Sequence, residues 1–184
     1  MFLRDCLALS LALGLNFKDG QIGNYTELGR LEHDAKTKAD IASADELAEY
    51  AAKAICDLPY YKDADCVCAP PPRPNKPFDL PSHIASKVSA TISKPDITSH
   101  LSCANARDEI KEASVDEKWD IWSEAGLQYN NNGFDVNGKN IILIDDKYQS
   151  GITLQFIAMK LQEAGANNVY GLCMVKTFGD KDNQ

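Results

Sequence analysis

Two adjacent acidic residues and a short hydroxyl-containing turn lie close together near the end of the chain. Asp145 and Asp146 directly follow the apolar run 141–144, and residues 150–153 then read Ser-Gly-Ile-Thr. In a parallel sheet, ligands bind at the carboxyl ends of the strands, where these residues are expected. A helix start that contains glycine offers free N–H groups to a phosphate, whereas carboxylates repel it. The acidic pair must therefore serve sugar hydroxyls or hydrated Mg²⁺.

This combination predicts a phosphorylated sugar bound together with a metal. Two other interpretations compete with it. Acidic residues after a strand can cap the next helix, but capping does not explain a Ser-Gly-x-Thr turn at this offset. An apolar strand that ends in two acids also resembles the first strand of response-regulator receiver domains. Those domains need several further βα units after the acids, and only 38 residues follow Asp146.

The elements that must position these residues are clearest in the last third of the chain. The continuous apolar run 141–144 is typical of a strand buried on both faces. Apolar side chains at helical spacing follow from Leu154 to Ala164, and Gly165 stands at the C-cap position. A further strand is expected over 169–175. We therefore expect two parallel strands joined by a right-handed crossover through a helix.

Upstream segments carry weaker signals. Two capping boxes predict helices that begin after Ser43 and Ser114, and Pro81 suits the first turn of another helix. Residues 66–69 are expected to form a short buried strand. The Pro-rich segment 69–77 then follows as a stiff loop, at a place where α/β folds carry binding loops.

The N-terminal forty residues and one later segment are harder to interpret. Residues 6–15 form an apolar run that we interpret as an amphipathic core helix, with a secretory signal as the alternative. The glycines within 17–40 favour turns between short strands. Residues 97–101 are expected to form a strand, and the polar segment 102–115 has no clear core face.

Composition limits the classes of function. The chain has 184 residues, which fits one domain over 1–184, and its 19 basic and 27 acidic side chains give a net charge of −8. Such a chain lacks the basic field of a protein that binds nucleic acid or an anionic membrane. No apolar run approaches the ~18 residues of a membrane span, so we expect a cytoplasmic protein without a membrane partner.

Cysteine and histidine do not form an evident metal site. The six cysteines are too sparse for a disulfide framework, and they include no Cys-x-x-Cys pair. We interpret Cys66 and Cys68 as buried reduced thiols on one side of a strand, with a metal site as the alternative. The three histidines are scattered, so we expect them on surfaces or in satisfied hydrogen bonds.

The segment from Ile141 to Thr153 resembles the signature of type I phosphoribosyltransferases. That signature is an apolar strand, two acids, a short loop and Ser/Thr-Gly-x-Thr, and residues 161–169 are also similar to the family. The rest of the chain resembles the competence-protein-F branch, without its four-cysteine zinc finger. In that branch a strand ends in a Pro-rich loop with basic residues, and a polar stretch with Arg and Lys precedes the signature strand.

The resemblance implies a fold, a substrate and a reaction. The fold is α/β, a mostly parallel five-stranded sheet flanked by helices, with a small hood from the terminal segments 1–40 and 176–184. The substrate is phosphoribosyl pyrophosphate (PRPP), used with Mg²⁺ in nucleotide metabolism. A nitrogenous base displaces pyrophosphate at C1′ through an oxocarbenium-like transition state, so the protein's task is to position the reactants and to neutralise the leaving group.

The resemblance also assigns roles to residues. Asp145 and Asp146 hold the ribose hydroxyls and Mg²⁺. Pro70 and Arg73 lie in the pyrophosphate loop 69–73, while Arg107 and Lys111 lie in a flexible loop, 103–118, that closes over it. Two of the chain's four arginines fall in these loops, as an acidic protein with an anionic ligand requires. The 5′-phosphate is expected at Gln149, Ser150, Gly151, Ile152 and Thr153.

An alternative function on the same fold stays open. Pro70, Pro71 and Pro72 have no N–H group, so the loop cannot cradle pyrophosphate through backbone donors there, unless a cis Xaa-Pro bond reshapes it. The alternative is a regulatory or accessory module that binds PRPP or a nucleotide without turnover. Relatives of the competence-protein-F branch are linked to DNA uptake. Dimers are common in the family, which makes a homodimer a further expectation.

Overall fold

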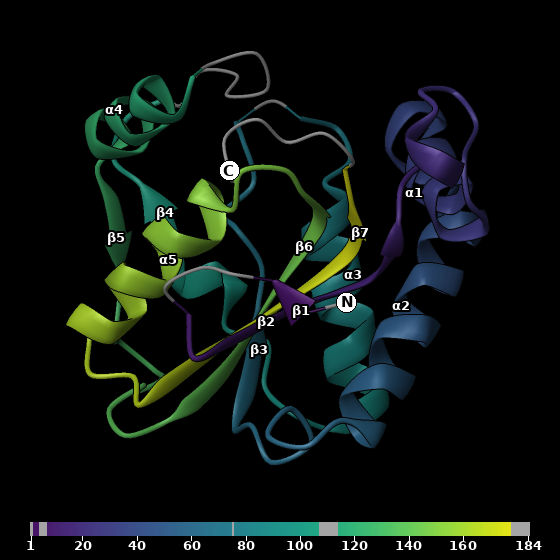
Figure 1. The fold of residues 1–184 in the computed structure, drawn as a ribbon. Helices are drawn as coiled ribbons and strands as arrows, with labels where there is room; N and C mark the ends of the chain where they lie inside the picture. The colour runs from purple at the N-terminus through teal and green to yellow at the C-terminus, as the bar shows by residue number, and fades with distance from the viewer. Residues whose placement is uncertain (1, 4–6, 75, 107–113, 178–184) are drawn as a thin grey trace.

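A five-stranded sheet forms the centre of the molecule (Figure 1). The computed structural model describes residues 2–3, 7–74, 76–106 and 114–177. Neighbouring pairs in the sheet are parallel except the pair at the N-terminal edge, so the predicted mostly parallel α/β sheet is confirmed. The strand order is β1 (Phe2–Leu3), β2 (Leu9–Leu15), β7 (Asn168–Lys176), β6 (Asn140–Tyr148) and β3 (Cys66–Cys68).

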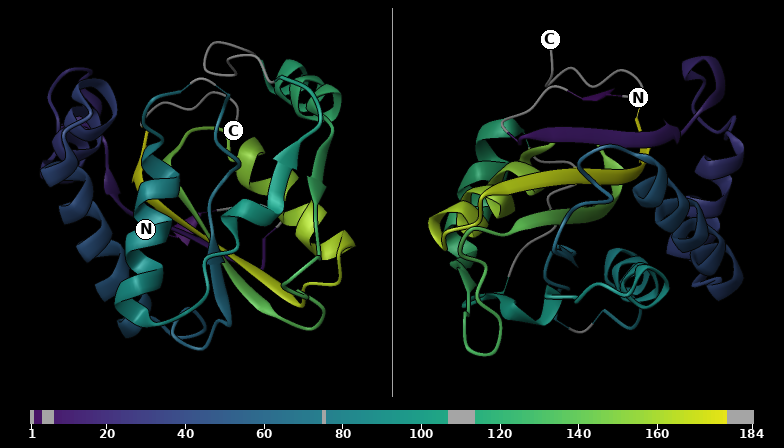
Figure 2. Two further views of the ribbon diagram at one scale, coloured as in Figure 1. Left: turned by 180° about the vertical axis from the view of Figure 1, so that it is seen from behind. Right: turned by 90° about the horizontal axis from the view of Figure 1, so that it is seen from below.

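Helices cover both faces of this sheet, as the two further views in Figure 2 also show. One face carries α1 (Glu27–Lys38), α2 (Ile41–Asp57) and α3 (Leu80–Ile92). The other face carries α5 (Ile152–Glu163), α4 (Val115–Ala125) and a small antiparallel sheet of β4 (Leu101–Cys103) and β5 (Leu127–Tyr129). Two short 3-10 helices, Lys18–Gly20 and Thr98–His100, complete the described elements.

Strand β6 is buried on both faces, as its continuous apolar sequence predicts. Ile142 and Ile144 belong to the core beneath α1–α3, whereas Ile141 and Leu143 belong to the core beneath α5. Successive side chains of a strand point to opposite faces, so a run without polar residues fills both layers. Strands β6 and β7 are parallel and α5 connects them, which confirms the predicted unit.

The N-terminal apolar run forms a strand, so the predicted helix over 6–15 is wrong. Within β2, leucine alternates with small residues, and Leu9, Leu11 and Leu13 lie against the core beneath α1–α3. The small residue Ala12 is in the opposite core. This period of two is a strand pattern. Parallel pairing with β7 supplies the backbone hydrogen bonds that a helix would have made internally.

Helix α1 occupies half of the segment 17–40, in which turns between short strands were expected, so that expectation is wrong for residues 27–38. The side chain of Thr26 caps the helix by accepting a hydrogen bond from the N–H of Gly29. Leu31 and Ala35 are buried one turn apart on the face that packs on the sheet. Gly29 allows this packing, because a Cβ there would overlap the backbone carbonyl of Asn16.

The predicted boundaries of the other helices and of one strand are partly confirmed. The capping box at Ser114 is present, and the helix that contains Pro81 forms. Helix α2 begins before Ser43, whose hydroxyl donates instead to Asp40, so that predicted start is wrong. The strand expected over 97–101 is a 3-10 helix followed by β4.

The cysteines and histidines behave largely as predicted. Cys66 and Cys68 are buried free thiols in one core, and burial raises the pKa of the Cys66 thiol to about 12. The histidines each make a hydrogen bond: His33 with Tyr25, His83 with Asp45 and His100 with the carbonyl of Asn130. No helix among the described residues is long and apolar enough to cross a membrane.

Candidate functional site

The acidic pair lies within β6, whose last two residues follow it. Asp145 is opposite Cys173 of β7, and the strand continues to Tyr148. Strict alternation of faces is lost at the end of β6, because Lys147 reaches Glu32 of α1 whereas Tyr148 lies in the core beneath α5. Asp146 faces the layer of α1–α3, and its side chain is only 8% exposed. The carboxylate of Asp145 accepts a hydrogen bond from the N–H of Asp146.

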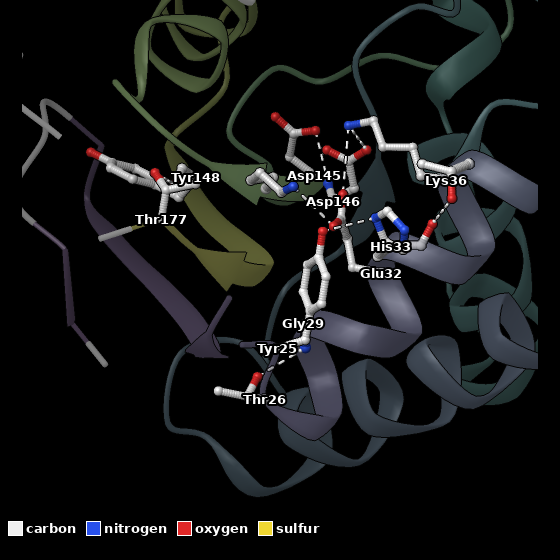
Figure 3. Close-up of polar contacts among 12 residues, drawn as sticks. Tyr25, Thr26, Gly29, Glu32, His33, Lys36, Asp145, Asp146, Tyr148 and Thr177 are labelled. Carbon is white, nitrogen blue, oxygen red and sulfur yellow. Dashed lines mark hydrogen bonds and ion pairs between the residues drawn. The ribbon is translucent and has the colours of Figure 1, made fainter. Parts of the chain in front are cut away.

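Helix α1 brings charged side chains to Asp146 (Figure 3). The Nζ of Lys36 lies 2.5 Å from Oδ2 of Asp146 and 3.7 Å from Oε1 of Glu32. The other carboxylate oxygen of Glu32 lies 2.9 Å from the Nζ of Lys147. Glu32 is almost fully buried, with a side chain that is 1% exposed. We call Glu32, Lys36, Asp145, Asp146 and Lys147 the charge cluster.

Burial and neighbouring charges shift the pKa values in the charge cluster in different directions. Burial, reinforced by the charge of Asp146, raises the pKa of Asp145 to about 8. Burial also acts on Asp146, but the ammonium of Lys36 outweighs it and lowers the pKa of that carboxyl. Burial raises the pKa of Glu32 in spite of Lys147. For Lys36, the carboxylates of Asp146 and Glu32 outweigh burial and raise the pKa.

The donor set at the acidic pair does not fit a resident divalent metal. Mg²⁺ requires oxygen ligands in near-octahedral geometry, and the described residues include no group of three or more acidic, Cys or His side chains that could hold a metal ion. The carboxylate of Asp146 is already paired with Lys36. Lys147 pairs directly with Glu32. Mg²⁺ at Asp145 and Asp146 thus stays a prediction that this geometry does not favour.

The turn after β6 has the geometry of an anion site. Gly151 adopts a left-handed conformation with φ 76° at the start of α5, and no side chain caps this helix. The first four N–H groups of a helix have no acceptor within it. Ser150 is buried and Thr153 is half-buried, while Gln149 is exposed. A Cβ at Gly151 would overlap the hydroxyl of Tyr148, so glycine is required for this turn.

The Pro-rich loop approaches the acidic pair from the neighbouring strand. Strands β3 and β6 are parallel and in register, so the loop after Cys68 starts at the same edge of the sheet. The charge of Lys76 contributes to lowering the pKa of Asp146, and that of Asp79 to raising the pKa of Asp145. Residues 76–79 therefore lie within electrostatic reach of the pair.

The backbone of this loop offers few donors to an anion. Pro70, Pro71 and Pro72 have no N–H, and the N–H of Ala69 donates to the hydroxyl of Thr98. The described residues contain no cis peptide bond, so the conditional cis Xaa-Pro bond is absent there. Pro70 is buried and Arg73 is half-buried. The backbone at 69–72 therefore leaves no N–H free to bind pyrophosphate.

The predicted flexible loop is shorter than expected. Cys103 ends β4, and Lys118 is a buried residue of α4, so both ends of the expected segment 103–118 are regular structure. Arg107 and Lys111 lie outside the described residues, and their role stays a prediction. Residues 178–184 of the expected hood also lie outside them.

Sequence reasoning missed Glu32 and Lys36. These residues were assigned to turns and short strands, so their position opposite β6 was not foreseen. One signal was available, because an acid and a base four residues apart lie on one face of a helix. Leu31 and Ala35 show the same spacing and bury the adjoining face. The pairing with Asp146 itself depends on tertiary packing.

No protein-family model matches the chain, and no curated protein matches it either. Among solved structures, adenine phosphoribosyltransferase from Leishmania tarentolae is similar with a TM-score of 0.51 and 10% identity, over 91% of this chain and 90% of that one. The same enzyme from Leishmania donovani is similar with a TM-score of 0.49 and 12% identity, over 78% and 68% of the two chains.

A glutamine PRPP amidotransferase from B. subtilis, complexed with ADP and GMP, is similar with a TM-score of 0.46 and 18% identity. The alignment covers 71% of this chain but spans only a quarter of that longer protein. These identities are low, so the likeness concerns the fold alone. The sheet, its flanking helices and the superposition on the L. tarentolae enzyme over 91% of the chain show that the chain has the α/β fold of the type I phosphoribosyltransferases.

Proposed function

We propose that this protein is a phosphoribosyltransferase that uses PRPP, with a nitrogenous base as acceptor and pyrophosphate as the other product. One observation carries the proposal. The uncapped start of α5, with Gly151 in a left-handed conformation, comes shortly after β6, the strand that carries the acidic pair. A phosphate at the helix start and a ribose at Asp145 would then lie side by side. The sequence signature and the shared fold support the same assignment.

The proposed reaction needs positioning rather than a covalent intermediate. The N–H groups of 151–153 hold the 5′-phosphate, and Asp145 accepts a hydrogen bond from a ribose hydroxyl. The base nitrogen forms a bond to C1′ while the bond from C1′ to the pyrophosphate oxygen breaks and its electron pair leaves with pyrophosphate. Arg73, Arg107 and Lys111 are the proposed cations that stabilise the departing charge.

Mg²⁺ is an expectation from the family resemblance, and no step above depends on it. If it takes part, it would neutralise pyrophosphate charge through the substrate's own oxygens, with Asp145 as the available carboxylate. We further propose a role in nucleotide metabolism in the cytoplasm, with a small phosphorylated sugar or nucleotide as the partner. Direct binding of nucleic acid is not expected, and a homodimer remains to be tested.

A second function is favoured by a specific observation. The segment 69–72 has no free backbone N–H donor, which weakens the pyrophosphate loop. A module that binds PRPP or a nucleotide without turnover needs only the phosphate turn and Asp145. This alternative includes the regulatory or accessory role, and the link to DNA uptake, that the competence-protein-F resemblance implies.

The deciding experiment is incubation of the full chain with PRPP and Mg²⁺ against a panel of purine, pyrimidine and pyridine bases, with pyrophosphate release as the readout. Release with one base supports the enzyme. Binding of PRPP by calorimetry without release supports the binding module, and no binding overturns both. Thr153→Val should weaken binding, because it removes a hydroxyl at the helix start. Thr91→Val is the matched control, since that exposed hydroxyl bonds only its own helix in the described contacts.

A further inference from the structure

The ammonium group of Lys36 lies between the carboxylates of Asp146 and Glu32. The geometry points to Lys36 as a built-in cation: we propose that it takes the place of a divalent metal at Asp146, so that the site binds a sugar phosphate without Mg²⁺. The inference rests on the proposed function for the identity of its ligand. The exclusion of a metal by Lys36 can be tested without that ligand.

The charges of the cluster nearly balance without a metal. Three carboxyl groups, those of Glu32, Asp145 and Asp146, face two ammonium groups, those of Lys36 and Lys147. When every group is ionised, the cluster has a net charge of −1. Adding a divalent ion would make that charge positive. Charged groups that are removed from water require such partners, and the cluster supplies them from its own side chains.

Lys36 is held in place by the packing of α1. The helix lies against the sheet through Leu31 and Ala35, and Gly29 brings its first turn against Asn16. The hydroxyl of Thr26 also donates to the carbonyl of Leu15. A metal at Asp146 would have to displace Lys36 and would leave Glu32 with one less neighbouring cation. The buried carboxylate of Glu32, which α1 holds in place, therefore opposes the displacement of Lys36 by a metal.

Lys36 also remains able to contact a ligand. Its side chain is 39% exposed, whereas those of Asp146 and Glu32 are 8% and 1% exposed. An ammonium group has three N–H donors, and Asp146 accepts from one of them. The remaining donors can reach a ligand oxygen on the solvent side. Lys147 instead pairs with the second oxygen of Glu32 and holds that carboxylate in place.

The first test uses the wild-type chain and ribose 5-phosphate, which lacks the pyrophosphate that chelates metals. Calorimetric Kd values in EDTA and in millimolar Mg²⁺ should agree within about threefold. A loss of about tenfold or more in EDTA would overturn the inference while leaving the proposed function intact. If neither ribose 5-phosphate nor PRPP binds under either condition, the proposed function fails, and the metal measurement below decides the inference.

The second test titrates Mn²⁺ and follows the signal of the free ion by electron paramagnetic resonance. The wild-type chain should show no Mn²⁺ site that is lost in Asp146→Asn, whereas Lys36→Gln should gain one. A wild-type site with that dependence on Asp146 overturns the inference, even if the Lys36 variant fails to fold. Lys36→Gln should also bind ribose 5-phosphate about tenfold more weakly in EDTA and regain affinity with Mg²⁺.

Two further variants are controls for charge and position. Lys36→Arg keeps the positive charge, so it should remain free of Mn²⁺ and bind the sugar phosphate in EDTA. Lys38→Gln removes a lysine from the same helix, where it is 65% exposed and pairs with Asp34 away from the charge cluster. It should behave as wild type in both tests. A gain of Mn²⁺ binding in Lys38→Gln equal to that in Lys36→Gln would overturn the assignment to Lys36.

Discussion

Lys36 of α1 and Asp146 of β6 form an ion pair with 2.5 Å between Nζ and Oδ2, and this contact divides the acidic pair into two unlike groups. Asp146 has a cation beside it, and its pKa is lowered. The carboxylate of Asp145 accepts the N–H of Asp146, while burial raises its pKa. Adjacent acids with opposite shifts are expected to respond differently to the same substitution.

Asp146→Asn should destabilise the fold, and Asp145→Asn should not. The first substitution leaves Lys36 without its main partner and should lower the free energy of unfolding by about 1–3 kcal/mol, less than for a fully buried pair because Lys36 is partly exposed. The second removes a carboxylate whose charged form is disfavoured by burial, and an Asn oxygen can still accept the same N–H. Urea unfolding of both variants at pH 7 measures this difference, and equal losses would contradict it.

The raised pKa of Asp145 also predicts a dependence of stability on pH. The folded pKa of about 8 lies above the ordinary value of roughly 3.9, so between these values the folded chain holds a proton that the unfolded chain has released. The free energy of unfolding should therefore fall as the pH rises through this window. Asp145→Asn should lose less stability than wild type between pH 5 and pH 8 in urea titrations. Parallel curves for the two proteins would refute the assigned shift.

Gly151→Ala tests the phosphate turn. An Ala at φ 76° is strained, and its Cβ would also overlap the Tyr148 hydroxyl, so a loss of about 1–3 kcal/mol is expected. Gly138→Ala is the matched control, because its φ is 71° and nothing lies within 4 Å of the added Cβ. Thermal unfolding should show a larger loss for Gly151→Ala. A smaller or equal loss would mean that the contact with Tyr148 does not constrain this turn.

The parts of the fold that were predictable from sequence are those in which local pattern and tertiary role agree. The apolar run of β6 fills two cores and has no polar residue to obscure it. Strand β2 was misinterpreted because its small residues, such as Ala12, made the run resemble a helix, although leucine at every second position indicates a strand. Helix α1 is polar on most of its surface, and its pairing with Asp146 joins segments far apart in sequence. No local pattern specifies such a contact.

The last prediction concerns Arg107 and Lys111, which lie between β4 and α4 and outside the described residues. If they stabilise departing pyrophosphate, changing both to Ala should lower turnover about a hundredfold or more, which is roughly 2.7 kcal/mol of transition-state stabilisation. Binding of a product nucleotide, which has no pyrophosphate, should change far less. The competing interpretation is a solvated charged face, for which substitution has little effect.

Steady-state turnover and product binding on the same double variant separate these interpretations. Lys53→Ala with Lys62→Ala is a suitable control, because both lysines lie on exposed positions of the surface and the pair removes the same charge. The control matters because the chain carries a net charge of −8, and any loss of two cations weakens its general attraction for anions. Unchanged turnover in the Arg107 and Lys111 variant would favour the non-catalytic binding module. A loss confined to that variant would tie the effect to its position rather than to charge.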